Sequence, residues 1–158
     1  VTGIGVLEVD RDRIKHLFHG VISASTHDTF PARISRIGID FRKILERFSP
    51  DVVVIEKIFL GKNADSAFKL GHARGVCMYE AVVAGTEVRE YATRLVKKMV
   101  TGSGAADKIQ VQIALERLLQ TPIKGALDAS DALALAYHHG IQMEVERKIN
   151  KMNLTSTL

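Results

Sequence analysis

The feature that most constrains the fold is an amphipathic segment followed directly by a short β-branched run. Apolar residues recur at steps of three and four through residues 30–48, which predicts a helix with one buried stripe. This helix is expected to begin at a cap near Thr29 and to end before Pro50. Asp51–Ile55 then predicts a strand that is buried on both faces, as in the centre of a parallel sheet.

The rest of the chain continues this alternation. Two strands, then helices alternating with strands, predict a layered α/β domain with a mixed sheet. One domain over residues 1–146 and a polar C-terminal tail over residues 147–158 are expected. The expected strands are Gly3–Val9, Arg13–Ser25 and Thr86–Tyr91, and the expected helices are about Ser66–Ala84, Ala92–Val100, Asp107–Leu119 and Leu127–Glu146.

Composition excludes several classes of protein. Hydrophobic residues are 46% and charged residues 25% of the 158 residues, which is ordinary for a globular protein and excludes a disordered or collagen-like chain. The longest apolar run, Ala132–Tyr137, is far shorter than the roughly 18 residues that a membrane span needs. A single cysteine, Cys77, excludes an internal disulfide. With no apolar leader at the start, a cytoplasmic location is expected.

Positive charge is concentrated in two windows. Residues 57–74 and 92–108 together hold eight basic and two acidic side chains, whereas the other fourteen basic side chains are outnumbered by sixteen acidic ones. Such windows are typical of a surface that faces nucleic acid. A solvated lysine-rich surface is the alternative.

Three carboxylates stand out by position. Glu56 directly follows the strand run, at the edge of a sheet where ligand-binding groups gather. Asp128 and Asp131 are three residues apart on one face of a helix, a spacing that suits a shared divalent cation. The alternatives are a solvated glutamate paired with Lys57, and two aspartates that complement the helix dipole.

Three further residues could contact DNA. Lys97 and Lys108 flank a Gly-Ser-Gly loop whose backbone N–H groups could face phosphates. Phe59 lies in a basic loop and could stack on bases. Solvated lysines and a core phenylalanine are the alternatives. Ala67, Gly71 and Gly75 form a small-residue face on their helix, which suits either a dimer contact or close packing on the sheet.

Several ordered blocks resemble the RuvC family of Holliday-junction resolvases. The match covers nearly the whole chain, and the order and spacing of the blocks follow the family. The blocks are Val54–Phe59, Lys62–Ala67, Leu70–Gly75, Glu90–Ala92, Val96–Lys98, Gly102–Gln112 and Leu127–Ala136.

The resemblance implies an RNase H-like fold with a five-stranded mixed sheet flanked by helices. It also implies a homodimer that nicks a four-way DNA junction symmetrically with Mg²⁺, two ions per active site, and that works with the branch-migration proteins RuvA and RuvB. Glu56, Asp128 and Asp131 resemble three of the family's four metal-binding acids. Lys97 and Lys108 resemble its phosphate-contacting lysines, and Phe59 its base-stacking aromatic residue.

One departure from the family pattern affects the expected activity. The family begins with a strand ending in Asp-Pro-Gly, which carries the first catalytic aspartate and lies in mid-sheet, and this chain begins after it at Val1. A chain made as written is therefore expected to be poorly folded and inactive. A non-catalytic junction-binding remnant is the alternative function, and a nuclease acting on RNA–DNA hybrids is a third.

Overall fold

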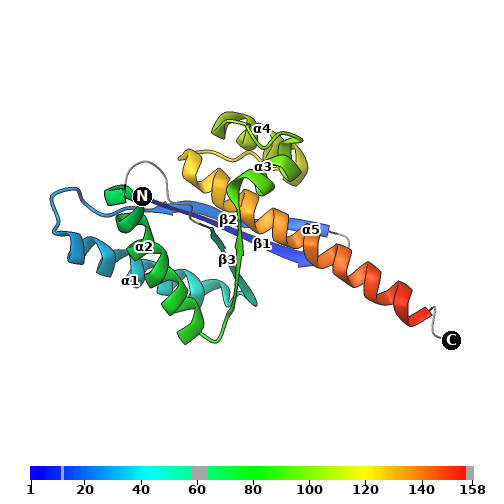
Figure 1. Cartoon of the computed structure of the whole chain (residues 1–158), viewed down its shortest axis with the longest axis horizontal. Coiled ribbons are helices and arrows are strands. Elements are labelled where there is room, and N and C mark those ends of the chain that lie inside the picture. Colours follow the sequence, from blue (N-terminus) through cyan, green and yellow to red (C-terminus); the bar gives the residue numbers. More distant parts are fainter. Residues whose placement is uncertain (12, 58–63, 156–158) are drawn as a thin grey trace.

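The computed structural model describes residues 1–11, 13–57 and 64–155, and Phe59 lies outside them. Strands and helices alternate as an α/β protein requires, so the α/β part of the predicted fold class is confirmed (Figure 1). The elements are β1 (Thr2–Asp10), β2 (Arg13–Ile22), α1 (Phe30–Phe48), β3 (Val52–Glu56), α2 (Ala64–Val83), β4 (Glu87–Tyr91), α3 (Thr93–Thr101), α4 (Lys108–Leu119) and α5 (Leu127–Thr155).

The first two strands form an antiparallel hairpin. β1 and β2 pair from Thr2 with Ile22 to Asp10 with Arg13, with an irregularity between Val6 and Leu7. The tight connection leaves Arg11 with a positive φ of 44°. β2 ends at Ile22, three residues earlier than the sequence suggests. The β1–β2 pairing stops at this residue, where Ile22 lies opposite Thr2.

The third and fourth strands form a parallel pair. β3 and β4 align from Val52 with Glu87 to Glu56 with Tyr91, and α2 makes the crossover between them. Parallel strands need such a long connection, which a helix usually supplies. The predicted parallel strand is therefore confirmed, and Glu56 is its last residue.

The expected five-stranded sheet is not found. In the described part of the chain the four strands form two separate two-stranded sheets, β1–β2 and β3–β4. No ladder joins β1 to β3, and both strands line the same cavity of about 990 Å³. The two sheets are separated at the position where the family resemblance places a central strand.

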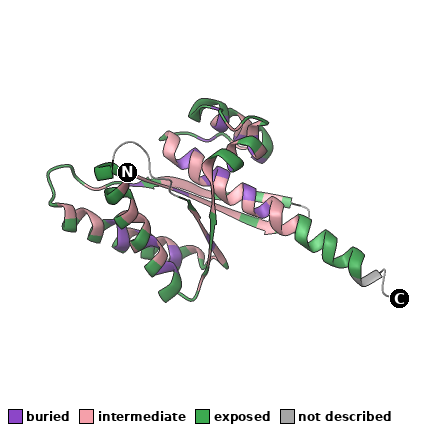
Figure 2. Cartoon of the chain, viewed as in Figure 1, coloured by how far each residue is buried: buried purple, intermediate pink, exposed green. Residues whose placement is uncertain are grey.

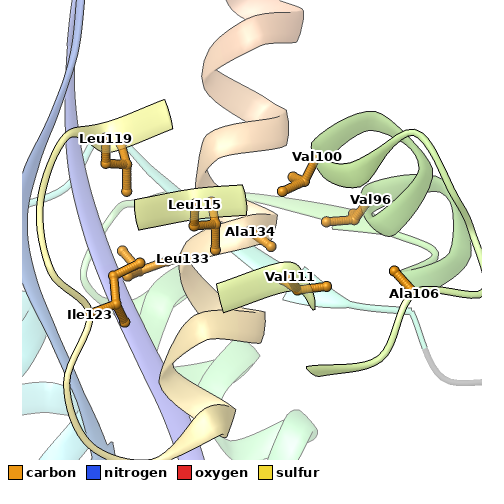
Figure 3. Packing of buried hydrophobic residues seen from close by; sticks show 9 residues of the cluster. All are labelled: Val96, Val100, Ala106, Val111, Leu115, Leu119, Ile123, Leu133 and Ala134. Atoms are coloured by element: carbon orange, nitrogen blue, oxygen red, sulfur yellow. The ribbon is translucent and has the colours of Figure 1, made fainter. Parts of the chain in front are cut away.

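The apolar side chains gather in two cores. One lies where α3, α4 and α5 meet and includes Val111, Leu115 and Leu133, which are fully buried (Figure 3). The other lies between α1, α2 and the strands and includes Phe41 and Ala81. Each core thus holds one group of helices against the strands.

α5 packs against β1 at very short range. A Cβ atom on Gly3 would overlap the backbone carbonyl of Asp128, and one on Gly5 would lie 2.6 Å from the backbone nitrogen of Leu133. Any other residue at these two strand positions would push the helix away. The start of α5, with Asp128, is therefore set by the start of β1.

α5 is longer than the sequence pattern indicates. The helix was expected to end at Glu146 but continues to Thr155, so residues 147–155 of the expected polar tail belong to α5. Figure 2 shows that the outer part of α5 is exposed. None of the helices in the described ranges has the combination of length and apolar character that a membrane span requires.

Candidate active site

Glu56 stands at the carboxyl end of β3, where the strand fixes its backbone. Its carboxylate accepts a hydrogen bond from the Thr93 hydroxyl at the first position of α3. Its backbone carbonyl accepts a bond from Arg74 Nε at 3.3 Å, and Arg74 also pairs with Glu90 on β4. The side chain is exposed and is oriented by Thr93 of α3, whereas Arg74 of α2 holds the backbone.

The carboxylates of Asp128 and Asp131 both contact the ammonium group of Lys108. Lys108 Nζ lies 2.6 Å from Asp128 Oδ1 and 3.3 Å from Asp131 Oδ2. The hydrogen bond that Lys108 donates to Asp128 raises the pKa of Lys108, partial burial opposes that effect, and the bond to Asp131 adds to it. Two carboxylates on one helical face therefore take a positive charge between them, as their spacing predicts.

Lys108 is placed by the start of α4. Asp107 caps this helix by accepting from the Gln110 backbone N–H at 2.8 Å, and the Gln110 side chain accepts from the Asp107 backbone N–H. Such a reciprocal cap fixes the first helical residue, which is Lys108. Lys97 on α3 donates to the carbonyl of Ala106 at 2.8 Å and so braces the loop that precedes the cap.

These side chains face one cavity of about 990 Å³, which runs from the start of α5 along β1 and β3. Three acids, two lysines and a hydroxyl thus share one space. Among the described residues, however, no three His, Cys, Asp or Glu side chains are close enough to form a single metal site. The lining residues at this end are Glu56, Thr93, Lys97, Lys108, Asp128 and Asp131.

Comparison with known proteins identifies the family of this chain. The family model described as crossover junction endodeoxyribonuclease RuvC matches residues 1–139. This chain belongs to the RuvC family. The match spans β1 to the middle of α5, so it includes every acid and lysine of the cavity.

Individual RuvC proteins are similar over most of their length. The crossover junction endodeoxyribonuclease RuvC of Bdellovibrio bacteriovorus is 55% identical over 144 residues, which are 91% of this chain and 86% of that protein. The protein of the same name from Actinobacillus pleuropneumoniae serotype 5b is 48% identical over 139 residues, 88% of this chain and 72% of that one.

Solved RuvC structures share the fold. The Thermus thermophilus RuvC structure superposes with a TM-score of 0.80 at 28% identity, over 91% of this chain and 89% of that one. T. thermophilus RuvC in complex with Holliday junction substrate gives a TM-score of 0.82 at 28% identity, over 91% and 88% of the two chains. The resemblance to the RuvC family inferred from the sequence blocks is confirmed.

Two residues of this RuvC-family site were missed in the sequence. Thr93 and Arg74 both contact Glu56 and both line the cavity. Thr93 carried a usable signal, because it begins a helix two residues after the strand that pairs with β3. Arg74 stands in a basic window and in the family block Leu70–Gly75, but nothing local in the sequence shows that it reaches the end of β3.

Proposed function

We propose that this protein is a structure-specific endonuclease that resolves four-way (Holliday) DNA junctions by metal-dependent hydrolysis, in homologous recombination and DNA repair. The observation that carries the proposal is the cavity in which Glu56, Asp128 and Asp131 lie with two lysines, in a chain of the RuvC family. The relatives are named for crossover-junction cleavage, which favours the enzyme over a non-catalytic remnant.

The acids suit divalent cations with oxygen ligands. Asp128 and Asp131 already take a positive charge between them from Lys108, which supports their role as ligands of Mg²⁺, with Glu56 as a third. Two bound ions would supply an activated water and positive charge beside the leaving oxygen. Thr93 orients the Glu56 carboxylate, and the start of β1 orients Asp128.

The lysines have a separate task. Lys97 and Lys108 line the cavity together with the three acids, where they would position a phosphate group of the DNA backbone. Phe59, outside the described residues, would stack on a base at the junction, as the family resemblance implies. Binding should therefore weaken steeply as salt increases.

Symmetric nicking needs two active sites, which a two-fold homodimer supplies. The α2 face with Gly71 and Gly75 is the proposed interface: in the described part of the chain, no atom beyond the helix's own backbone lies within 4 Å of either Cβ position, so the alternative of close packing on the sheet loses support. A second cavity of about 670 Å³ lies on this face, with Phe68 and Tyr79 exposed beside it. The family resemblance further implies RuvA and RuvB as partners.

The decisive experiment is an Asp131→Asn variant of the protein. Cleavage of a synthetic four-way junction in Mg²⁺ should fall below detection, because one metal ligand loses its charge, while junction binding in Ca²⁺ should persist. Asp28→Asn changes an exposed aspartate outside the cavity and should cut normally. Undiminished cleavage by Asp131→Asn would remove Asp131 from the active site.

The substrate panel separates the remaining functions. Four-way junction, linear duplex and RNA–DNA hybrid are compared under the same conditions. Cleavage confined to the junction supports the proposal, and preferred cleavage of the hybrid would assign the protein to another class of nuclease. Junction binding without cleavage by the unaltered protein would support the non-catalytic alternative.

A further inference from the structure

A bulge in β2 brings two histidines to the same face of the β1–β2 hairpin. His16 and Phe18 pair with consecutive residues of β1, so Leu17 between them is an extra residue in the ladder. In a regular strand, successive side chains point to opposite faces, and residues three positions apart would face opposite ways. The extra residue reverses this relation for His16 and His19, whose rings lie in contact.

The face that the two histidines share is the one on which α5 packs. A Cβ on Gly140 of α5 would lie 3.0 Å from the side chain of Ile14, which precedes His16 by two residues and therefore points the same way. The His19 ring reaches the loop between α4 and α5, where its Nε2 lies 2.9 Å from the carbonyl oxygen of Lys124. The bulge thus aims both rings toward the segment that leads into α5.

Hydrogen bonds determine which nitrogen of each ring carries the proton. The Lys124 carbonyl can only accept, so His19 Nε2 donates to it. In a neutral ring the other nitrogen, Nδ1, is then an acceptor, and it lies 2.8 Å from His16 Nε2, which donates to it. A backbone carbonyl therefore orients the His19 ring so that its Nδ1 lone pair is directed at His16. Histidines that bind metals are commonly held by such a carbonyl on their second nitrogen.

We propose that His16 Nε2 and His19 Nδ1 form a binding site for a transition-metal ion of the zinc class. The ion would take the place of the proton between the two nitrogens, and the His16 ring would carry its proton on Nδ1 instead, so that both rings bind as neutral imidazole. Imidazole suits Zn²⁺, Cu²⁺ and Ni²⁺ better than Mg²⁺. Two nitrogens on a tetrahedral Zn²⁺ ion are roughly 3.3 Å apart, so the observed gap of 2.8 Å needs to widen by only about 0.5 Å.

The proposed site is open and lies apart from the acids. Within residues 1–11, 13–57 and 64–155, no cluster of three His, Cys, Asp or Glu side chains is arranged to hold a metal ion, so water would complete the coordination. Binding should therefore be weaker than at structural zinc sites, which have four protein ligands. His16, His19 and Lys124 do not line the cavity that holds the acids, so this inference does not depend on DNA cleavage.

The test is a calorimetric titration of the protein with Zn²⁺ at pH 7.5, without an added histidine tag. Asp128 and Asp131 are both replaced by Asn in this background, so that they do not compete for the ion. His16→Gln and His19→Gln should each weaken Zn²⁺ binding at least tenfold, because each removes one of two ligands. His27→Gln changes an exposed histidine in a turn and should bind like its parent. Thermal unfolding without metal verifies that the variants fold.

Nitrogen NMR of the histidine rings in the unaltered protein tests the geometry independently. Zn²⁺ should shift the signals of His16 Nε2 and His19 Nδ1, while His19 Nε2 keeps the proton that it donates to Lys124. Equal Zn²⁺ affinity of the parent, His16→Gln and His19→Gln would overturn the proposal. So would coordination of the ion through Nε2 of His19, because that nitrogen faces the carbonyl and not the other ring.

Discussion

Two carboxylates on α5 share the ammonium group of Lys108, so this lysine is already engaged before any DNA arrives. The sequence predicted that Asp128 and Asp131 lie on one helical face, because that follows from helix geometry alone. It did not predict their cation, because Lys108 lies 20 residues from Asp128 and is brought to it by the packing of α4 on α5. The local part of the site was therefore predictable, and the non-local part was not.

Replacement of Lys108 tests the phosphate contact that is proposed for it. Lys108→Ala should reduce the slope of log binding constant against log salt by about one, since one fewer phosphate charge is neutralised, and should slow junction cleavage. Binding titrations at several salt concentrations measure the slope. Lys43→Ala removes a lysine paired with Asp40 on α1 and should leave slope and rate unchanged. An unchanged slope and rate in Lys108→Ala would discard the assigned role.

Helix boundaries show where local pattern suffices. α1 begins and ends as its apolar stripe and Pro50 predict. α5 does not stop where predicted, because the residues after Glu146 include good helix formers and no Gly or Pro. Gly140 within it is explained by packing, since a Cβ there would lie 3.1 Å from Val9 and 3.0 Å from Ile14.

The contact between β1 and α5 gives a prediction about elements. Gly3→Ala would place a methyl group against the Asp128 carbonyl and should destabilise the protein by about 1–3 kcal/mol, with a loss of cleavage as Asp128 moves. Urea unfolding and junction cleavage measure the two effects. Gly20→Ala is the matched strand variant: its Cβ would meet only the tip of the Phe18 ring, at 3.2 Å, so a near-neutral result is expected. Equal stability of both variants would show that α5 has room to shift.

An ion pair between α1 and α2 should make stability depend on pH. Arg42 donates to both carboxylate oxygens of Glu80, at 2.7 and 2.8 Å, and these bonds hold the pKa of Glu80 below its ordinary value of 4.5 although burial opposes them. A depressed folded-state pKa stabilises the protein above the unfolded-state value, and this contribution is lost as pH falls through the folded-state pKa.

Glu80→Gln should therefore be less stable than the unaltered protein at pH 7. The difference should shrink below about pH 4.5, because protonated glutamate resembles glutamine in charge. Urea unfolding at pH 7, 5 and 3.5 measures it, with Glu146→Gln, an exposed glutamate on α5, as the control. A difference that is constant across this range would exclude the ion pair as its cause.

At the scale of the whole molecule, the sequence predicted the strands better than the sheet. Each strand is recognisable from local pattern, but a ladder needs a partner, and β1 and β3 have none between them among the described residues. The family resemblance predicted that a strand belongs between β1 and β3, whereas composition and hydrophobic periodicity could not. In the same way, the spacing of small residues on α2 could suggest a contact surface there, but it could not identify what binds to that surface.

The proposed dimer can be tested on that face. Gly71→Leu adds a bulky side chain where this chain has open space, so the monomer should fold while close contact between two copies is blocked. Sedimentation analysis should show a shift from dimer to monomer, and junction cleavage should lose its paired nicks. Gly85, with a positive φ in the turn after α2, is unsuitable for such a test. A dimer that persists in Gly71→Leu would move the interface elsewhere.

The division of apolar side chains into two cores has a consequence for control of the reaction. Glu56 ends a strand rooted in the core under α1 and α2, whereas Asp128 and Asp131 begin a helix rooted in the core with α3 and α4. The carboxylates on the two sides of the cavity therefore rest on different cores, and β1 contributes to both of these cores through Ile4 and Leu7. The separation between Glu56 and the two aspartates thus depends on how β1 joins the cores.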